Sequence, residues 1–380
     1  MDSVISMEER TVLEMIQRYT SDVLAPAASE IDEMGTFVTR HLRGMAELGL
    51  MGMNLPETFG GAGLRPQILF EAVAAIAGAC GSTASMLTAH FLATDSVLLG
   101  GDDTLQQRYL PGAASGALLG AFALTEPQAG SNPADMTTHA ERDGDTYRLN
   151  GVKHFISNGG VADFVIVYAK TDMDAGYNGI SAFIVDKDTP GFSANAAEKT
   201  MGLKGGHVFE LSFVGCVIPA TNRIGEEGTG FRTAMKVLDN GRVEVAAMCV
   251  GIAEAAFKAA CAWMKDRQVS GKPIERYQGL QWMIADMATD LRAARLLSLD
   301  AATLRGKGER FSLQAAMAKL HASEMAARVT DMALQIHGGY GYTRDMPLER
   351  YVRDVRIMRI YEGSSEIQRN IIARDILARA

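Results

Sequence analysis

The chain has 380 residues, of which 47% are hydrophobic and 22% charged, a globular composition with enough length for two or three domains. Its 37 Lys and Arg residues against 45 Asp and Glu give a net charge of −8, without a long run of one sign. We therefore expect neither nucleic acid nor an anionic membrane as a partner. The four cysteines, Cys80, Cys216, Cys249 and Cys261, are scattered without CxxC spacing and predict reduced thiols in a cytosol-like compartment.

Two regions bear on membrane targeting. Residues 1–10 carry neither the basic segment nor the apolar run of a targeting peptide, so we expect a cytoplasmic protein. The most apolar region, 69–93, is interrupted by polar residues such as Glu71 and His90. It predicts a buried helix pair rather than a membrane span.

The hydrophobic period changes twice along the chain. From Ser6 to about Leu119 it is helical, with a Ser6/Glu9 capping box at the start of the first helix and Pro26 at its expected end. From 121 to about 224 the period is two, and Asn150-Gly151 predicts a hairpin turn. After 228–230 four long helical stretches follow, the last running through Leu377.

These periods predict an α+β multidomain protein. We expect an N-terminal α-helical domain over 1–120, a middle antiparallel β-barrel-like domain over 121–226, and a C-terminal four-helix bundle over 227–380. The strands have no helices between them, which argues against βαβ units.

Several familiar sites are missing from the sequence. It contains no GxGxxG after a strand, no GxSxG and no HExxH. A di-iron centre needs Glu-x-x-His on two helices, whereas His321 and Glu324 occur once and in reversed order. We expect no metal site.

Three segments are candidates for chemistry, each with a simpler alternative. The Pro-, Gly- and Ser-rich residues 124–133 suit a polar or anionic ligand, or form a plain turn between domains. Phe155 and Ser157 share a strand face that could hold a flat heterocycle, or Phe155 is a core aromatic. Glu362 precedes a helix capped by Ser365 and Gln368, and is either a complement to the helix dipole or a base presented on a loop.

Together these segments resemble the acyl-CoA dehydrogenase family over nearly the whole chain. Five stretches match its signatures in the family's order: LTEPxAGS at 124–131, LNGxKxFISNGG at 149–160, NRIGEEGxGF at 222–231, QIHGGYGY at 335–342, and 350–364, which ends in IYEGS. Five matches on an α–β–α layout make the resemblance specific.

The resemblance implies FAD-dependent α,β-dehydrogenation of an acyl-CoA thioester to the trans-2-enoyl-CoA. Glu362 would remove the α-proton while flavin N5 takes the β-hydride. Some family members carry the base at the position of Gly241 instead, which here has no carboxyl group. The family also implies a homotetramer, at least a dimer, whose FAD is shared between subunits, and an electron-transferring flavoprotein as electron acceptor.

The remaining site residues follow from the same resemblance. FAD contacts are expected from Phe122, Leu124, Thr125, Gly130, Ser131, Phe155, Ser157, Arg267, Gln278, Gln335, Gly338, Gly339, Ser364 and Glu366. Substrate contacts are expected from Ser131, Asp239, Arg242, Tyr361 and Gly363, with the pocket floor built from residues 84–88 and the helix near Gly241.

The acyl group is expected to be short or methyl-branched, as in fatty acid or branched-chain amino acid catabolism. Other functions remain open on the same fold: an acyl-CoA oxidase, an enoyl-CoA reductase, or a non-catalytic CoA-binding scaffold. The intact Tyr361-Glu362-Gly363 argues against the scaffold.

Overall fold

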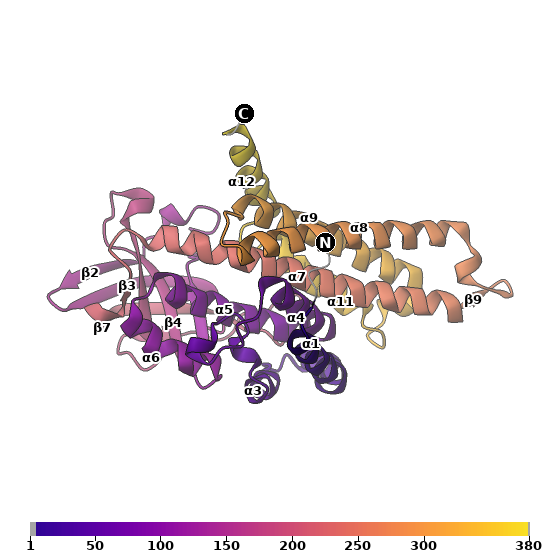
Figure 1. Ribbon diagram of the computed structural model, residues 1–380, viewed down its shortest axis with the longest axis horizontal. Coiled ribbons are helices and arrows are strands. Elements are labelled where there is room, and N and C mark those ends of the chain that lie inside the picture. Colours follow the sequence, from indigo (N-terminus) through magenta and orange to yellow (C-terminus); the bar gives the residue numbers. More distant parts are fainter. Residues whose placement is uncertain (1–4, 379–380) are drawn as a thin grey trace.

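The computed structural model describes residues 5–378, so residues 1–4, part of the segment that carried the localisation prediction, lie outside it. Helices, a β-sheet and further helices follow one another along the chain, as the change of period predicts. Figure 1 shows the sheet at one end of an elongated molecule, the long C-terminal helices running away from it, and the first helices packed along one side.

The N-terminal helices begin as predicted. Ser6 Oγ accepts a hydrogen bond from the Glu9 N–H at 3.1 Å, and the Ser6 N–H donates to the Glu9 carboxylate at 2.9 Å, which confirms the capping box. The predicted end at Pro26 is wrong, because a wide π-type turn at Thr20–Leu24 leads directly into a second helix. Pro26 lies in its first turn, where no N–H is needed. The helices are α1 Met7–Tyr19, α2 Ala25–Met34, α3 Thr39–Glu47, α4 Pro66–Ala79, α5 Gly81–Gly100 and α6 Asp103–Ala114.

The middle of the chain forms one eight-stranded sheet. Its strands are β1 Gly120–Ala123, β2 His139–Asp143, β3 Thr146–Ser157, β4 Phe164–Lys170, β5 Ile180–Asp186, β6 Phe192–Ala194, β7 Val208–Pro219 and β8 Arg223–Ile224. The order is β6-β7-β3-β2-β4-β5-β8, with β1 beside β4. Most neighbours are antiparallel, as predicted, but β1 and the start of β2 pair with β4 in parallel, so the sheet is mixed. Successive residues of β4 alternate between the two faces of the sheet. One set packs on the face toward α5 and α6, and the other set packs on the opposite face.

The predicted hairpin at Asn150-Gly151 is wrong. β3 continues through both residues, and its register with β7 shifts there by a bulge. Asn150 Oδ1 accepts the Gly215 N–H at 2.7 Å across this bulge, so the Asn side chain holds the neighbouring strand instead of making a turn. The hairpin before β3 turns at Gly144, whose φ is 56°.

The C-terminal part has three long helices, α7 Gly230–Asp266, α8 Gln278–Gly306 and α9 Ser312–His337. The short strands β9 Gln268–Val269 and β10 Lys272–Pro273 connect α7 to α8. The prediction of a fourth long helix is wrong, since that stretch divides into α10 Gly339–Tyr342, α11 Leu348–Val355 and α12 Ser365–Leu377. Figure 1 shows α12 projecting away from the bundle.

Helix α7 organises the core. Among the described residues it is the one helix long and apolar enough to cross a membrane by length and composition alone. Most of its apolar stretch is buried, and it packs against α4, α5, α8 and α9. Its hydrophobicity is thus accounted for by packing within this fold.

Candidate active site

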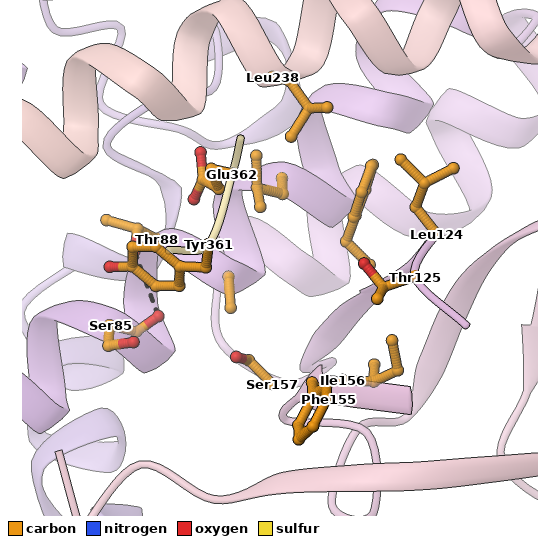
Figure 2. Close-up of a pocket in the computed structure, with 13 residues that line it drawn as sticks. Ser85, Thr88, Leu124, Thr125, Phe155, Ile156, Ser157, Leu238, Tyr361 and Glu362 are labelled. Carbon is orange, nitrogen blue, oxygen red and sulfur yellow. Dashed lines mark hydrogen bonds between the residues drawn. The ribbon is translucent and has the colours of Figure 1, made fainter. Parts of the chain in front are cut away.

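A cavity lies where α5, the strands β1 and β3, α7 and the segment before α12 meet. Figure 2 shows its side chains converging from these separate parts of the chain, with Glu362 and Tyr361 opposite Phe155 and Ser157. Its lining consists of Ser85, Thr88, Ala89, Leu92, Phe122, Leu124, Thr125, Phe155, Ile156, Ser157, Leu238, Tyr361 and Glu362. A second, more apolar cavity, between residues 200–208 and 353–361, shares Ser85, Phe155, Ser157 and Tyr361 with it.

Glu362 lies on a sharp elbow between the last 3-10 turn, Arg356–Arg359, and α12. Its φ is 51° and that of Gly363 is 88°, so two successive residues adopt left-handed conformations. The N-cap of α12 is Ser364, whose Oγ accepts the Ile367 N–H at 3.4 Å. The predicted cap at Ser365 is therefore wrong by one residue, since the Ser365 hydroxyl donates to Glu324 at 2.7 Å instead.

Glu362 has the properties of a base. Burial raises the pKa of its carboxyl group to about 7, although the nearby cations Lys319 and Arg242 act to lower it. Its Oε2 is buried and has no hydrogen-bond partner among residues 5–378. A carboxylate that only complemented a helix dipole would have a lowered pKa. The raised pKa and the unpartnered Oε2 of Glu362 therefore favour the second alternative, a base presented on a loop.

Gly241 on α7 makes room for this carboxyl group. A Cβ atom at Gly241 would overlap Glu362 Oε2 and would lie 2.7 Å from Leu92 Cδ2. The position that carries the base in some family members is thus the place where the Glu362 side chain rests in this chain.

The loop between β1 and β2 is held from beneath by a buried ion pair. Lys153 Nζ donates to Glu126 Oε1 at 2.8 Å and to the Leu124 carbonyl at 3.0 Å. The Glu126 carboxylate also accepts the backbone N–H groups of Thr137 at 2.7 Å and Thr138 at 3.0 Å. These contacts fix Leu124 and Thr125 at the cavity wall.

Phe155 and Ser157 line the same cavity, as predicted, although strict alternation is broken. Phe155 has φ 58° and lies in a second bulge of β3, between Lys153 and Ile156. Its ring is 61% exposed and stacks on His154 with 4.1 Å between centroids. An exposed aromatic face beside a hydroxyl group suits a flat polar heterocycle.

Other predicted cofactor residues lie outside this cavity. Gly130 and Ser131 are exposed on the β1–β2 loop, and Ser364 and Glu366 begin α12 directly after the elbow. None of the four is part of the cavity wall that the described residues form.

A further group gathers at the opposite end of the bundle, near β9 in Figure 1. Arg267, Gly338 and Gly339 line one cavity there, and the Arg267 guanidinium lies 5.5 Å from the Tyr340 ring centroid. Gln278 and Gln335 are exposed at the same end of α8 and α9. The predicted FAD residues of one chain therefore form two separate clusters.

The predicted substrate residues Asp239 and Arg242 form an ion pair of 2.5 Å on α7. Asp239 also accepts a hydrogen bond from the Ser312 hydroxyl, and these residues line a cavity with Arg310 and Arg374. This cavity borders the second half of α12, where Ile371 and Arg374 line it.

Some of the residues that form the site were not predicted from the sequence. Leu92, Ile156 and Leu238 are apolar residues of regular elements, and nothing in their local pattern distinguishes wall residues from core residues. Lys319 and Gln368, which hold the elbow, are fully buried. A lysine on the alanine-rich face formed by Ala315, Ala318 and Ala322 was a usable signal for a buried cation.

Within residues 5–378, no group of three or more His, Cys, Asp or Glu side chains is arranged to hold a metal ion. Glu324 lies 2.9 Å from Arg359 in an ion pair and accepts the Ser365 hydroxyl.

Comparison with known proteins agrees with this architecture. Three family models match the chain: Acyl-CoA dehydrogenase, N-terminal domain, at 6–117; middle domain at 121–216; and C-terminal domain at 228–377. The chain is 44% identical to an acryloyl-CoA reductase (NADH) of Anaerotignum propionicum, over 100% of this chain and 97% of that one. It is 41% identical to a short-chain-specific acyl-CoA dehydrogenase of Clostridium acetobutylicum, over 99% and 100%.

Solved structures give the same result. Butyryl-CoA dehydrogenase from Megasphaera elsdenii has a TM-score of 0.97 at 38% identity, covering 99% of this chain and 100% of that one. A chain from work on the electron transferring flavoprotein of Acidaminococcus fermentans has a TM-score of 0.97 at 41% identity, with the same coverage. PigA, solved with FAD and proline, has a TM-score of 0.96 at 30% identity and full coverage of both chains.

The fold and the site define an oxidoreductase that handles an acyl thioester. The chain belongs to the acyl-CoA dehydrogenase family. It is a flavoprotein whose cofactor is FAD and whose substrate is an acyl-CoA.

Proposed function

We propose that Glu362 is the base that removes the α-proton of an acyl-CoA during its oxidation to the trans-2-enoyl-CoA. The observation that carries this proposal is the buried Oε2, which lacks a partner among the described residues and belongs to a carboxyl group with a pKa of about 7. A base of that pKa is ionised in a useful fraction near neutral pH and still binds a proton well.

The residues around the cavity fit FAD. The exposed Phe155 ring and the Ser157 hydroxyl offer a flat face and a donor there. Away from this cavity, a Cβ at Gly130, Gly338 or Gly339 would meet nothing within 4 Å, so the backbone at these positions is open to a ligand. Bound FAD supplies the acceptor for the β-hydrogen and its two electrons. Thr125 and Leu124, fixed by the Lys153–Glu126 pair, would hold the cofactor at this cavity.

The acyl chain lies in the apolar part of the cavity between α5 and α7. Thr88, Leu92 and Leu238 enclose it and exclude water from Glu362, which maintains the raised pKa of the base. Asp239 and Arg242 bind the polar arm of CoA, and Ser131 lies on the loop that borders the site. We infer a short or methyl-branched acyl group, supported by the short-chain-specific relative and the butyryl-CoA dehydrogenase neighbour.

The FAD site is completed by a second copy of the chain. Arg267, Gly338 and Gly339 lie at the opposite end of the bundle from Glu362, so they serve the cofactor of a neighbouring subunit. This arrangement supports a dimer as the smallest active unit, and the homotetramer that the family resemblance implies is the proposed full assembly. An electron-transferring flavoprotein is the proposed electron acceptor, supported by the structural neighbour from work on such a protein.

A second candidate is the reverse reaction, reduction of an enoyl-CoA. The acryloyl-CoA reductase (NADH) relative at 44% identity favours it. In that direction protonated Glu362 would donate its proton to the α-carbon, and a pKa of about 7 serves either role.

Steady-state oxidation of propionyl-, butyryl-, isobutyryl-, isovaleryl- and octanoyl-CoA tests the proposal. We expect kcat/KM to peak at four or five carbons with electron-transferring flavoprotein as acceptor. A peak at octanoyl-CoA would refute the short-chain assignment. Turnover of acryloyl-CoA with NADH, without turnover of any saturated thioester, would establish the reductase instead.

A further inference from the structure

Lys319 on α9 is a fully buried cation beneath the Glu362 elbow. Its Nζ donates to the Gly363 carbonyl at 2.7 Å. In the described part of the chain no carboxylate lies within ion-pair distance, 4.0 Å, of this ammonium group. A buried lysine without such a partner is costly, and burial lowers the pKa of Lys319 to about 8. Its hydrogen bond thus goes to the backbone directly after Glu362.

The elbow needs such support because its conformation is unfavourable. A glutamate at φ 51° lies in the left-handed region that residues with a side chain rarely adopt, so the surroundings must offset its strain, whereas Gly363 accepts its φ of 88° freely. Gln368, fully buried on α12, donates through Nε2 to the Glu362 carbonyl at 3.1 Å and to the Gly363 carbonyl at 3.0 Å. Two buried donors from two helices therefore meet at the Gly363 carbonyl, and Gln368 also holds the Glu362 carbonyl.

We propose that Lys319 is a positioning residue for Glu362: its ammonium group fixes the elbow through the Gly363 carbonyl and holds a positive charge near the carboxylate, beyond ion-pair distance. The proposal rests on the assignment of Glu362 as base. Gln368 supports the same elbow without a charge.

Other charged and titratable groups also face Glu362. Arg242 and Glu244 approach from α7, and Tyr361 precedes Glu362 on the elbow itself. Arg242 and Lys319 favour the ionised carboxyl group, whereas Glu244, a buried acid next to Arg305 of α8, repels it. Glu324 and Cys249 face Lys319 rather than Glu362. Loss of Lys319 leaves Arg242 as the only cation among these groups that stabilises ionised Glu362.

The test is the pH dependence of anaerobic flavin reduction by butyryl-CoA in the FAD-loaded protein, from pH 5.5 to 9. For Lys319→Met we expect the midpoint to rise by about one pH unit, because an adjacent opposite charge typically shifts a carboxyl pKa by that amount or more. The limiting rate at pH 7 falls at least about tenfold, and the butyryl-CoA concentration for half-saturation changes less than about threefold. Lys319→Arg keeps the charge and restores the wild-type midpoint.

Two further variants separate charge from geometry. Gln368→Leu removes neutral donors, so we expect an approximately tenfold slower rate with an unshifted midpoint. Lys307→Met removes an exposed cation that pairs with Glu309, and serves as the matched control without effect on rate or midpoint.

A Lys319→Met protein with native FAD content and the wild-type midpoint would overturn the proposal. If that variant fails to fold, a wild-type rate in Gln368→Leu overturns the role of the elbow contacts. Flavin reduction that persists at full rate in Glu362→Gln is a separate result, because it refutes Glu362 as base and not Lys319 as its support.

Discussion

If Glu362 is the base, as proposed, its protonation state sets the pH dependence of the reaction. Its pKa is raised to about 7 by burial, and the base acts only when ionised, so the rate of flavin reduction rises with pH and levels off above that value. We expect the rate at pH 6 to be about one tenth of its plateau, which rapid-mixing absorbance at several pH values measures. A flat profile between pH 6 and 8 would show that another group controls the step.

The space beside Glu362 depends on Gly241. Gly241→Ala places a methyl group against Glu362 Oε2 and Leu92, so the carboxyl group must move. We expect kcat to fall about tenfold or more, while FAD content is retained, because misplacement by about 1 Å is enough to cost that much. Gly279→Ala on α8 is the matched control, since a Cβ there meets nothing within 4 Å. Equal activity of the two variants would contradict this account.

At the scale of single residues, the site residues that lie within the recognisable sequence motifs could be predicted. Glu362, Tyr361, Phe155, Ser157 and Thr125 line one cavity. Lys319 could not be assigned, because its role depends on α9 passing beneath an elbow 44 residues later in the chain. Only packing brings these two segments together.

The β1–β2 loop depends on the buried pair of Glu126 and Lys153. Lys153→Met leaves the Glu126 carboxylate without its cation, so we expect the free energy of unfolding to fall by about 3 kcal/mol. Urea unfolding followed by circular dichroism measures this loss. The double variant Lys153→Met with Glu126→Leu should be more stable than the single variant, since no buried charge remains. A double variant less stable than the single one would contradict this explanation.

At the scale of elements, strongly periodic helices and strands were predictable and their ends were not. The Asn150-Gly151 pair is typical of a hairpin. The residues on both sides of it pair with the same neighbouring strand, β7, so β3 continues through the pair without turning. A proline usually ends a helix. Here the π-type turn before Pro26 places this residue in the first turn of the next helix, α2. Tertiary pairing thus outweighs the local signal at Asn150-Gly151, whereas at Pro26 the outcome follows from the local backbone geometry of the π-type turn.

The whole molecule follows the predicted order of helices, sheet and helices. That order could be predicted because the hydrophobic period changes from about 3.6 to 2 and back. The separation of the proposed FAD residues into two clusters could not be predicted, because it depends on where the far end of the bundle lies relative to Glu362.

The two clusters lead to a prediction about assembly. If Arg267 serves the cofactor of a neighbouring subunit, we expect Arg267→Ala to weaken FAD binding about tenfold, because one charged hydrogen bond is lost. The pH midpoint of flavin reduction in the FAD-loaded enzyme should not change. Fluorescence titration of the apoprotein with FAD measures the affinity. In mixed assemblies of Arg267→Ala and Glu362→Gln chains at limiting FAD, sites that combine the wild-type Arg267 of one chain with the wild-type Glu362 of the other should recover wild-type FAD affinity and activity. Failure to recover it, with tight FAD binding in a monomer, would contradict the shared site.

The most direct test of the central claim is anaerobic absorbance of the FAD-loaded protein mixed with butyryl-CoA. We predict that the flavin bands bleach in the wild-type protein and in Glu309→Gln, an exposed control, whereas Glu362→Gln retains its FAD spectrum and bleaches at least about a thousandfold more slowly. Bleaching of Glu362→Gln at the wild-type rate would show that Glu362 does not remove the α-proton.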